Sequence, residues 1–416
     1  MKRYEEYKDT GIGWIPELPH NWDTKKISSL FDERRTKVSD KDYAPLSVSK
    51  SGITPQLETA VKSDNGDNRK LVVAGDFVVN SRSDRKGSCG ISPLTGSVSL
   101  INIVLHPRRE INGNYFHYLS RSNNYIEEYY RLGRGIVADL WTTRYSELKS
   151  IYIPYPPLAE QEKIVRFLES KTLCIDAYIA ERERELQLLN ELKESEIANI
   201  ITRGLNPDVK MKDSGIFWQP RVPEHWNVTR LKYVITKLSR ERRPEDELLV
   251  CSNSGEVRKR GESKLGLVAN SDEIYQGVRK GDLLIHGMDT WHGAIAVSMY
   301  DGMCTPVVHV CDSTQEKEYI ALYLRNMAAQ KIFKLISNGV RQNTSDFRSW
   351  DKLARIPIPV PPITEQRDII AYVSDKCNKV NSLITELEGE IEYLKEYKQK
   401  LIADCVTGQI NVQSEI

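Results

Sequence analysis

The chain has 416 residues, 40% of them hydrophobic and 28% charged, with a formal net charge of +1. This length exceeds what one ordinary hydrophobic core fills, so two or more domains are expected. Seven isolated cysteines without a CxxC pair argue against a disulfide framework and a zinc site. The sequence has no signal-like or membrane-spanning apolar run, and together these features favour a reducing cytoplasm.

In chain order, short strand-like runs are expected at 71–73, 77–79 and 101–105, followed by a helical stretch near 114–131. A long helical pattern follows Pro156-Pro157. Strand-like runs return at 283–285 and 307–310, with a helical stretch near 316–336, and a second long helical pattern follows Pro361-Pro362.

This order reflects an internal repeat. Residues 8–22 read KDTGIGWIPELPHNW and residues 212–226 read KDSGIFWQPRVPEHW, an offset of 204. IPYPPLAEQ at 153–161 matches IPVPPITEQ at 358–366, and GDFVVN at 75–80 matches GDLLIH at 281–286. Three matches at nearly one offset predict two copies of a head and a helical tail.

Charge alternates along these segments. Residues 1–150 hold 23 basic and 19 acidic side chains, as do 207–357, whereas 151–206 hold 7 and 10, and 358–416 hold 6 and 10. The predicted domains are a first head at 1–152, a first spacer helix at 153–206, a second head at 207–357 and a second spacer helix at 358–416. Basic heads suit DNA phosphates, whereas acidic helices suit protein partners.

The predicted fold is α/β (α+β) in the heads, joined by two long helices packed as an antiparallel intramolecular coiled coil with a pseudo-two-fold repeat. Each helix of about 45 residues would be roughly 68 Å long. Apolar residues at heptad spacing form the predicted seam: Leu168, Ile175, Ile179, Leu186, Leu189, Val380, Ile384, Leu387, Ile391 and Leu394.

Two lysines interrupt the seam at equivalent positions, Lys193 and Lys398. In the interpretation we favour, each ammonium reaches past the seam to water. In the alternative, each lysine pairs with a Glu across the seam and fixes the register. The tryptophans of the opening motif, Trp14, Trp22, Trp218 and Trp226, are interpreted as packing of head onto helix.

KDTGIGWIPELPHNW, PPLAEQEKIV and IITRGLN, with their second copies KDSGIFWQPRVPEHW, PPITEQRDII and CVTGQIN, resemble the specificity subunit of type I restriction-modification systems. The resemblance covers the whole chain. It implies two target-recognition domains, each reading one half of a bipartite DNA target, and spacer helices that bind methyltransferase subunits. Because the head interiors diverge, the target is expected to be asymmetric.

Base reading needs donors and acceptors on loops, and phosphate contacts need cations. Three loops per head suit this role, although any surface loop is rich in such residues. The candidate DNA-binding residues are Lys50, Ser51, Arg82, Arg85, Lys86, Arg134, Arg144, Asn253, Arg258, Lys259, Arg260, Asp289, Trp291, His292, Arg341, Gln342, Asn343 and Arg348.

No phosphate-binding loop, methyl-donor motif or nuclease motif is evident, so the chain is expected to be non-catalytic and to bind neither metal nor cofactor. His286 and His292 lack carboxylate support in the sequence and are interpreted as polar loop residues. The expected partners are double-stranded DNA and two methyltransferase subunits that use S-adenosylmethionine, with no membrane.

Whether two restriction (helicase-nuclease) subunits using ATP and Mg also join stays open. An orphan or antagonist subunit, which binds methyltransferase subunits without supporting restriction, is an alternative that the sequence does not separate. A general nucleic-acid clamp is disfavoured by the modest charge of the heads.

Overall fold

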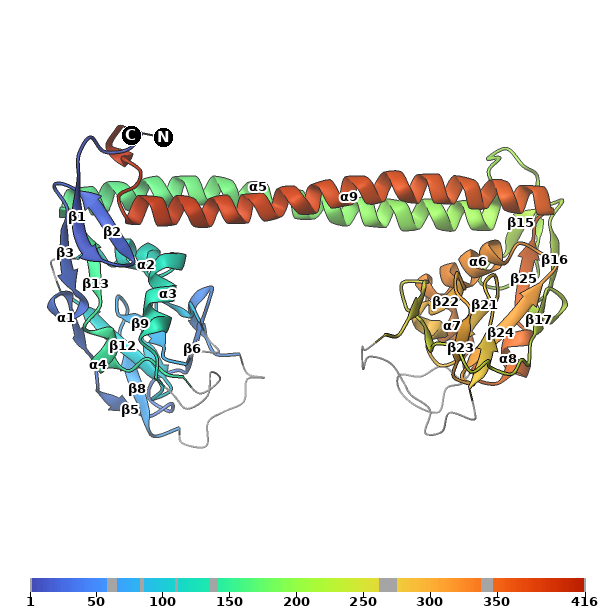
Figure 1. Ribbon diagram of the computed structural model, residues 1–416, viewed down its shortest axis with the longest axis horizontal. Coiled ribbons are helices and arrows are strands. Elements are labelled where there is room, and N and C mark those ends of the chain that lie inside the picture. Colours follow the sequence, from blue (N-terminus) through green and yellow to red (C-terminus); the bar gives the residue numbers. More distant parts are fainter. Residues whose placement is uncertain are drawn as a thin grey trace. The chain divides into compact units, whose positions relative to one another are not determined.

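A computed structural model of the chain describes residues 2–57, 66–82, 86–108, 111–134, 141–261, 275–337 and 347–414. The chain forms two compact units: unit 1 is Met1–Arg184 with Leu387–Ile416, and unit 2 is Glu185–Glu386. Each unit contains one head and part of each long helix, α5 (Leu158–Arg203) and α9 (Ile363–Val406) (Figure 1). The units therefore divide both helices, whereas the predicted segments separate head from helix. Within the described ranges, no helix is long and apolar enough to cross a bilayer.

Among the described residues, the first head consists of short strands and four short helices that precede α5. Its elements are β1 (Tyr7–Ile12), β2 (Ile15–Pro19), β3 (Asp23–Lys26), α1 (Ile27–Leu30), β4 (Phe31–Glu33), β5 (Lys37–Val38), β6 (Leu46–Ser49), β7 (Gly52–Pro55), β8 (Arg69–Val72), β9 (Phe77–Asn80), β10 (Cys89–Ile91), β11 (Gly96–Val98), β12 (Asn102–Pro107), α2 (Gly113–Leu119), α3 (Asn123–Arg131), α4 (Tyr145–Leu148) and β13 (Tyr152–Tyr155).

The second head follows the same plan between the two long helices. Its elements are β14 (Met211–Asp213), β15 (Arg221–Pro223), β16 (Asn227–Arg230), η3 (Leu231–Tyr233), β17 (Ile235–Lys237), β18 (Leu249–Cys251), β19 (Val257–Lys259), β20 (Gln276–Val278), β21 (Leu283–His286), η5 (Thr290–His292), β22 (Ile295–Val297), β23 (Gly302–Cys304), β24 (Val308–Ser313), α6 (Lys317–Ala329), α7 (Ile332–Ile336), α8 (Trp350–Ala354) and β25 (Pro357–Val360); η6 (Val412–Ser414) lies near the C-terminus.

The strand orders of the two heads match. The largest sheet of the first head has the order β10-β9-β12-β4, and that of the second is β22-β21-β24-β17, with antiparallel neighbours throughout. The last strand of each head, β13 or β25, pairs with an early strand, β3 or β16. The chain therefore has a mixed α/β fold with two domains, as the sequence predicts.

Each predicted head helix is broken in two. In the first head, the Ser122 hydroxyl caps α3 by accepting from the backbone N–H of Tyr125, so a new helix begins there. In the second head, Lys331 adopts a φ of 58° between α6 and α7, which ends the first helix. The Ser122 cap and the left-handed conformation of Lys331 thus interrupt helices that the continuous apolar pattern predicts as unbroken.

The opening motif of each head is a tight β-hairpin. Asp9 Oδ1 accepts from the N–H of Gly11 at 2.9 Å, and Asp213 Oδ1 accepts from the N–H of Gly215 at 2.9 Å. Both glycines have positive φ, 67° and 69°, which explains why the motif requires glycine at this turn. The repeated KDTG and KDSG sequences therefore form the same turn in both heads.

Trp22 and Trp226, which end this motif, are fully buried. Trp22 belongs to a core that contains Leu168 of α5 and Leu401 of α9, and Trp226 packs with Ile200 of α5 and Ile369 of α9. Their predicted role in packing head onto helix is confirmed. Trp14 and Trp218 are only partly buried and contact the cores from the outside.

The two long helices pack on each other inside each unit. In unit 1, Asp176 of α5 contacts Lys398 of α9, and Tyr178 donates to Glu390 at 2.9 Å. In unit 2, Lys193 donates to Asn381 at 2.6 Å, and Glu196 accepts from Tyr372 at 2.8 Å.

Burial along the helices follows the heptad positions. Leu168, Ile179, Val380 and Ile391 are buried; Ile175, Leu186, Leu189, Ile384, Leu387 and Leu394 are half-buried. The residues that flank these positions, such as Leu188 and Leu383, are largely exposed. The contact face of each helix therefore has the spacing of the predicted seam.

Candidate nucleic-acid interface

The first candidate loop is the turn of the β6–β7 hairpin, where Lys50 and Ser51 are exposed. Ser49 and Ser51 share a hydroxyl hydrogen bond of 2.7 Å, and Ser49 Oγ donates to the carbonyl of Gly52 at 3.2 Å. These bonds fix the turn, so the Lys50 and Ser51 side chains are held at its tip.

The second head repeats this turn between β18 and β19. Ser252 and Ser254 again share a hydroxyl hydrogen bond of 2.7 Å, and Asn253 is exposed at the tip. Turns of one geometry with different tip residues can present different donors and acceptors to DNA.

An arginine that our sequence analysis did not select supports each hairpin. A Cβ placed on Gly52 would lie 3.2 Å from Arg121 Nη2, and one placed on Gly255 would overlap the Arg325 guanidinium. Arg121 Nη2 also donates to the carbonyl of Cys89 at 3.2 Å. These arginines are 204 residues apart, the offset of the opening motif, and alignment of the repeat could have revealed them.

In unit 1, the second and third candidate loops lie side by side. Arg82 and Arg134 both form isolated β-bridges with Thr142, and the Arg134 N–H donates to the Thr142 carbonyl at 3.2 Å. Loops separated by about fifty residues in sequence therefore form one surface. Arg134 is the more available cation, because its side chain is 84% exposed and the nearest carboxylate of a described residue, that of Glu147, lies 4.0 Å away.

The other basic candidates of unit 1 differ in availability. Lys86 is bonded to Glu127 and lies 4.5 Å from the centre of the Tyr130 ring, so it is largely engaged within the head. Lys50, Arg82 and Arg144 are exposed, and none of them forms an ion pair with a described residue. Exposed cations of this kind can meet phosphates.

In unit 2, several candidates are engaged within the head. Arg258 pairs with Glu256 at 2.6 Å, and Lys259 pairs with Glu247 at 2.9 Å. Arg260 is partly buried. Arg348 is exposed and lies beside the β21 end, since a Cβ on Gly287 would lie 2.9 Å from the Arg348 Cα. Arg348 is therefore the candidate of this set best placed to meet a phosphate.

The loop after β21 holds a small polar cluster. Asp289 lies 3.2 Å from His286 Nδ1 and 3.9 Å from His292 Nδ1. Burial lowers the pKa of His286, and the nearby Asp289 carboxylate opposes that shift. No group of metal-binding side chains is found among the residues that the structure describes.

Three candidates of the second head border a hollow of about 850 Å³, which helix residues also line. Asn253, Trp291 and His292 lie on the head side, and Lys193 and Cys377 lie on the helix side. The Trp291 ring packs against the head core, and Lys334 lies 5.7 Å from its centre. Trp291 is thus partly a structural residue.

Arg85, Arg341, Gln342 and Asn343 lie outside the described residues. In unit 1, bridges to Thr142 bring the loops of Arg82 and Arg134 together, and in unit 2 Asn253, Trp291 and His292 border one hollow. Which individual side chains contact bases stays a prediction.

Sequence comparisons find similar proteins of one kind. The family described as type I restriction modification DNA specificity domain matches residues 19–188. The specificity subunit assigned to the MjaX type I restriction enzyme of Methanocaldococcus jannaschii is 22% identical, over 99% of this chain and 98% of its own length. The EcoDI specificity subunit of Escherichia coli is 19% identical, over 95% of this chain and 90% of its own length.

Solved structures show a similar fold. A chain from a study of complex assembly and conformational transition of the type I R-M system has a TM-score of 0.70 at 17% identity, covering 94% of this chain and 99% of its own. The HsdS subunit from Thermoanaerobacter tengcongensis has a TM-score of 0.53 at 17% identity, covering 94% and 98%.

Proposed function

We propose that the chain is a member of the type I restriction-modification DNA specificity family, and that each of its heads reads one half of an asymmetric, bipartite DNA target. The observation that carries this proposal is the pair of heads with one strand order and different loop chemistry. Equal frameworks present their loops alike, while the first head offers free cations and the second an Asn-tipped hairpin. Two different readers recognise two different half-sites.

The long helices serve as the spacer between the readers. Heptad burial and the contacts of Asp176 with Lys398 and of Lys193 with Asn381 support an antiparallel coiled coil with approximate two-fold symmetry. A continuous helix has a fixed rise per residue, so it fixes the separation of the half-sites. Inserting one heptad near Leu189 should lengthen the arbitrary spacer of the target or abolish assembly; an unchanged spacer would refute this role.

Partner methyltransferase subunits dock on the outer faces of these helices. Leu173, Leu188 and Leu192 of α5 are 55–72% exposed, and Tyr393 of α9 is 76% exposed. Large apolar side chains on an otherwise acidic helix favour a protein partner over DNA. The assembled complex transfers a methyl group from S-adenosylmethionine to adenine, and any restriction subunits would supply the ATP- and Mg-dependent cleavage.

The chain itself contributes recognition and no chemistry. We expect the purified chain to show no methyl transfer, and to confer sequence-specific adenine methylation when mixed with the methyltransferase subunit and S-adenosylmethionine. Both expectations are measured as methyl incorporation into duplexes that contain the target and into scrambled duplexes, for the chain alone and for the mixture. Transfer by the chain alone, or equal transfer to scrambled DNA by the assembled complex, would contradict this function.

A further inference from the structure

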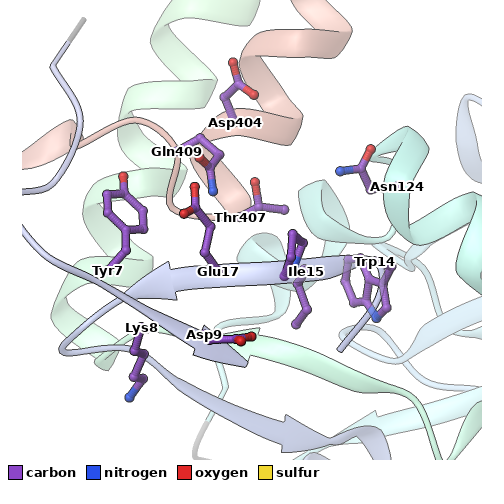
Figure 2. A pocket seen from close by; sticks show the side chains of 11 residues that line it. Tyr7, Lys8, Asp9, Trp14, Ile15, Glu17, Asn124, Asp404, Thr407 and Gln409 are labelled. Atoms are coloured by element: carbon purple, nitrogen blue, oxygen red, sulfur yellow. The ribbon is translucent and has the colours of Figure 1, made fainter. Parts of the chain in front are cut away.

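A hollow of about 540 Å³ lies in unit 1 between the opening hairpin and the end of α9. Figure 2 shows Ile15 and Glu17 of β2 facing Thr407, with Trp14 and Asn124 at one end and Tyr7 at the other. We call it the Trp14 hollow. It adjoins a second hollow of about 400 Å³ that shares Asn124 and Asp404, so the two together have room for a chain segment.

Unit 2 has a hollow of about 520 Å³ at the equivalent place, which we call the Trp218 hollow. Trp218, Pro220 and Arg221 stand where Trp14, Pro16 and Glu17 stand in unit 1, at the 204-residue offset. Asn199 and Thr202 correspond to Asp404 and Thr407 at the 205-residue offset. The repeat therefore builds the same hollow twice.

The charges of the two hollows are opposite. The Trp14 hollow is lined by Asp9, Glu17 and Asp404 against the cation Lys8, and the adjoining hollow adds Glu392 and Glu396 against Lys395 and Lys400. The Trp218 hollow is lined by Arg203 and Arg221 and by no carboxylate. At the matched positions, Glu17 is replaced by Arg221 and Asp404 by Asn199. A charged segment that fits one hollow is therefore repelled by the other.

Of the three carboxylates that line the Trp14 hollow, that of Asp404 has no hydrogen-bonding or ion-pair partner among the described residues. Arg3 already pairs with Glu17, and Asp9 accepts from the N–H of Gly11. The Asp404 carboxylate is half-buried and forms no hydrogen bond or ion pair with a described residue. Burial raises its pKa, and Lys400 opposes the shift. An incoming cation would offset the desolvation of this carboxylate.

The arginines of the Trp218 hollow carry no such penalty. Arg203 and Arg221 are both exposed, so water solvates their charges. The two hollows thus differ in kind: the first contains an unpaired, half-buried anion, and the second presents hydrated cations. This difference makes the Trp14 hollow the one that gains most from a ligand, and that ligand is basic.

We propose that the Trp14 hollow binds an arginine- or lysine-bearing segment of a methyltransferase subunit, and that the Trp218 hollow disfavours the same segment. The inference rests on the proposed function, in which two copies of this partner join the chain. Because identical partners meet opposite charges, they bind with unequal affinity, and the half of the chain that carries the Trp14 hollow is occupied first.

The test is a titration of the full-length chain with a methyltransferase subunit from the same organism, followed by native mass spectrometry. In the unaltered chain, the dissociation constants of the two binding steps should differ by more than the statistical factor of about four that is expected for two equal sites. Asp404→Asn should weaken the tighter step about fivefold and leave the other within about twofold, since only one hollow loses its anion. Arg221→Glu should strengthen the weaker step.

Asp42→Asn is the matched control, because Asp42 is exposed in the turn before β6 and lines neither hollow. It should leave both steps unchanged. Thermal unfolding of Asp404→Asn checks that the variant is folded. If two subunits bind and Asp404→Asn and Arg221→Glu leave both steps unchanged, the inference is wrong while the proposed function stands. If no subunit binds the unaltered chain, both fail.

Discussion

Within unit 1, the Nζ atom of Lys398 lies 2.6 Å from both carboxylate oxygens of Asp176, so a lysine of one long helix is fixed to the other. In unit 2, Lys193 instead donates to the neutral amide oxygen of Asn381 at 2.6 Å. Asp176 and Asn381 occupy equivalent positions of the repeat. The seam therefore contains the same lysine twice, once with a charged acceptor and once with a neutral one.

This difference predicts two unequal coupling energies. A double-mutant cycle of Lys398→Ala and Asp176→Ala should give about 0.5–1 kcal/mol, reduced by salt, because the pair is partly exposed. The matched cycle of Lys193→Ala and Asn381→Ala should give a smaller, salt-insensitive value. Urea unfolding at low and high salt measures both. Equal couplings with equal salt dependence would show that the acceptor charge is irrelevant.

Two glycines of unit 1 should respond oppositely to alanine. Gly389 lies inside α9 with nothing near its Cβ position, so Gly389→Ala should stabilise unit 1 by about 0.5–1 kcal/mol. Gly408 has a φ of 74°, and its Cβ would overlap Pro19 and lie 3.2 Å from Trp22. Gly408→Ala should destabilise by about 1–3 kcal/mol.

Urea unfolding of both variants tests the docking of the opening hairpin on the end of α9. A neutral effect of Gly408→Ala would mean that the hairpin does not pack there.

His117 predicts a pH dependence of the first head. Its Nδ1 accepts from the N–H of Ile91 at 3.2 Å, and burial lowers the pKa of His117 to about 4. The unfolded chain therefore binds more protons than the folded head between about pH 4 and 6.5, and stability falls as the pH drops through this window.

His117→Gln keeps an acceptor for Ile91 and removes the titration, so its stability should depend less on pH over the same range. Urea unfolding midpoints at several pH values measure the slope. If stability of the variant depends on pH as steeply as that of the unaltered chain, the pH dependence comes from groups other than His117.

Arg134 and Arg131 form a matched pair for DNA binding. Arg134 lies on the candidate surface with a distant carboxylate, whereas Arg131 is bonded to Glu128 at 2.7 Å on α3. In the assembled complex, Arg134→Ala should weaken binding and lower the salt slope by about one, as expected for one lost phosphate contact. Arg131→Ala should change neither. Fluorescence anisotropy across a salt series measures the DNA affinity of each complex. Equal effects of both substitutions would reject the proposed surface.

Much of this architecture can be predicted from the sequence because its signals are local or periodic. The repeated motif letters specify the hairpin turns through Asp9 and Gly11, and heptad spacing predicts which helix face is buried. The breaks at Ser122 and Lys331 were missed because capping and one positive φ are weak signals within an apolar pattern. Our favoured interpretation of Lys398, an ammonium reaching water, is wrong: it bonds an Asp, rather than the Glu of the alternative.

The candidate site is less predictable. The loops could be chosen from their composition, but contacts between distant segments decide which residues are available. Lys86 is engaged by Glu127, and Trp291 packs on the core, whereas Arg121 supports the β6–β7 hairpin through its approach to Gly52. Such contacts depend on tertiary packing, which a single sequence does not encode in any local pattern.

In the proposed function, two different heads read two half-sites for partner enzymes. The most direct measurement is sequencing of methylated adenines in genomic DNA from cells with the unaltered gene, without it, and with residues 1–152 exchanged for the first head of another family member. We expect a two-part motif that disappears with the gene, and a change in only one half after the exchange. Methylation that persists without the gene, or a change in both halves, would contradict it.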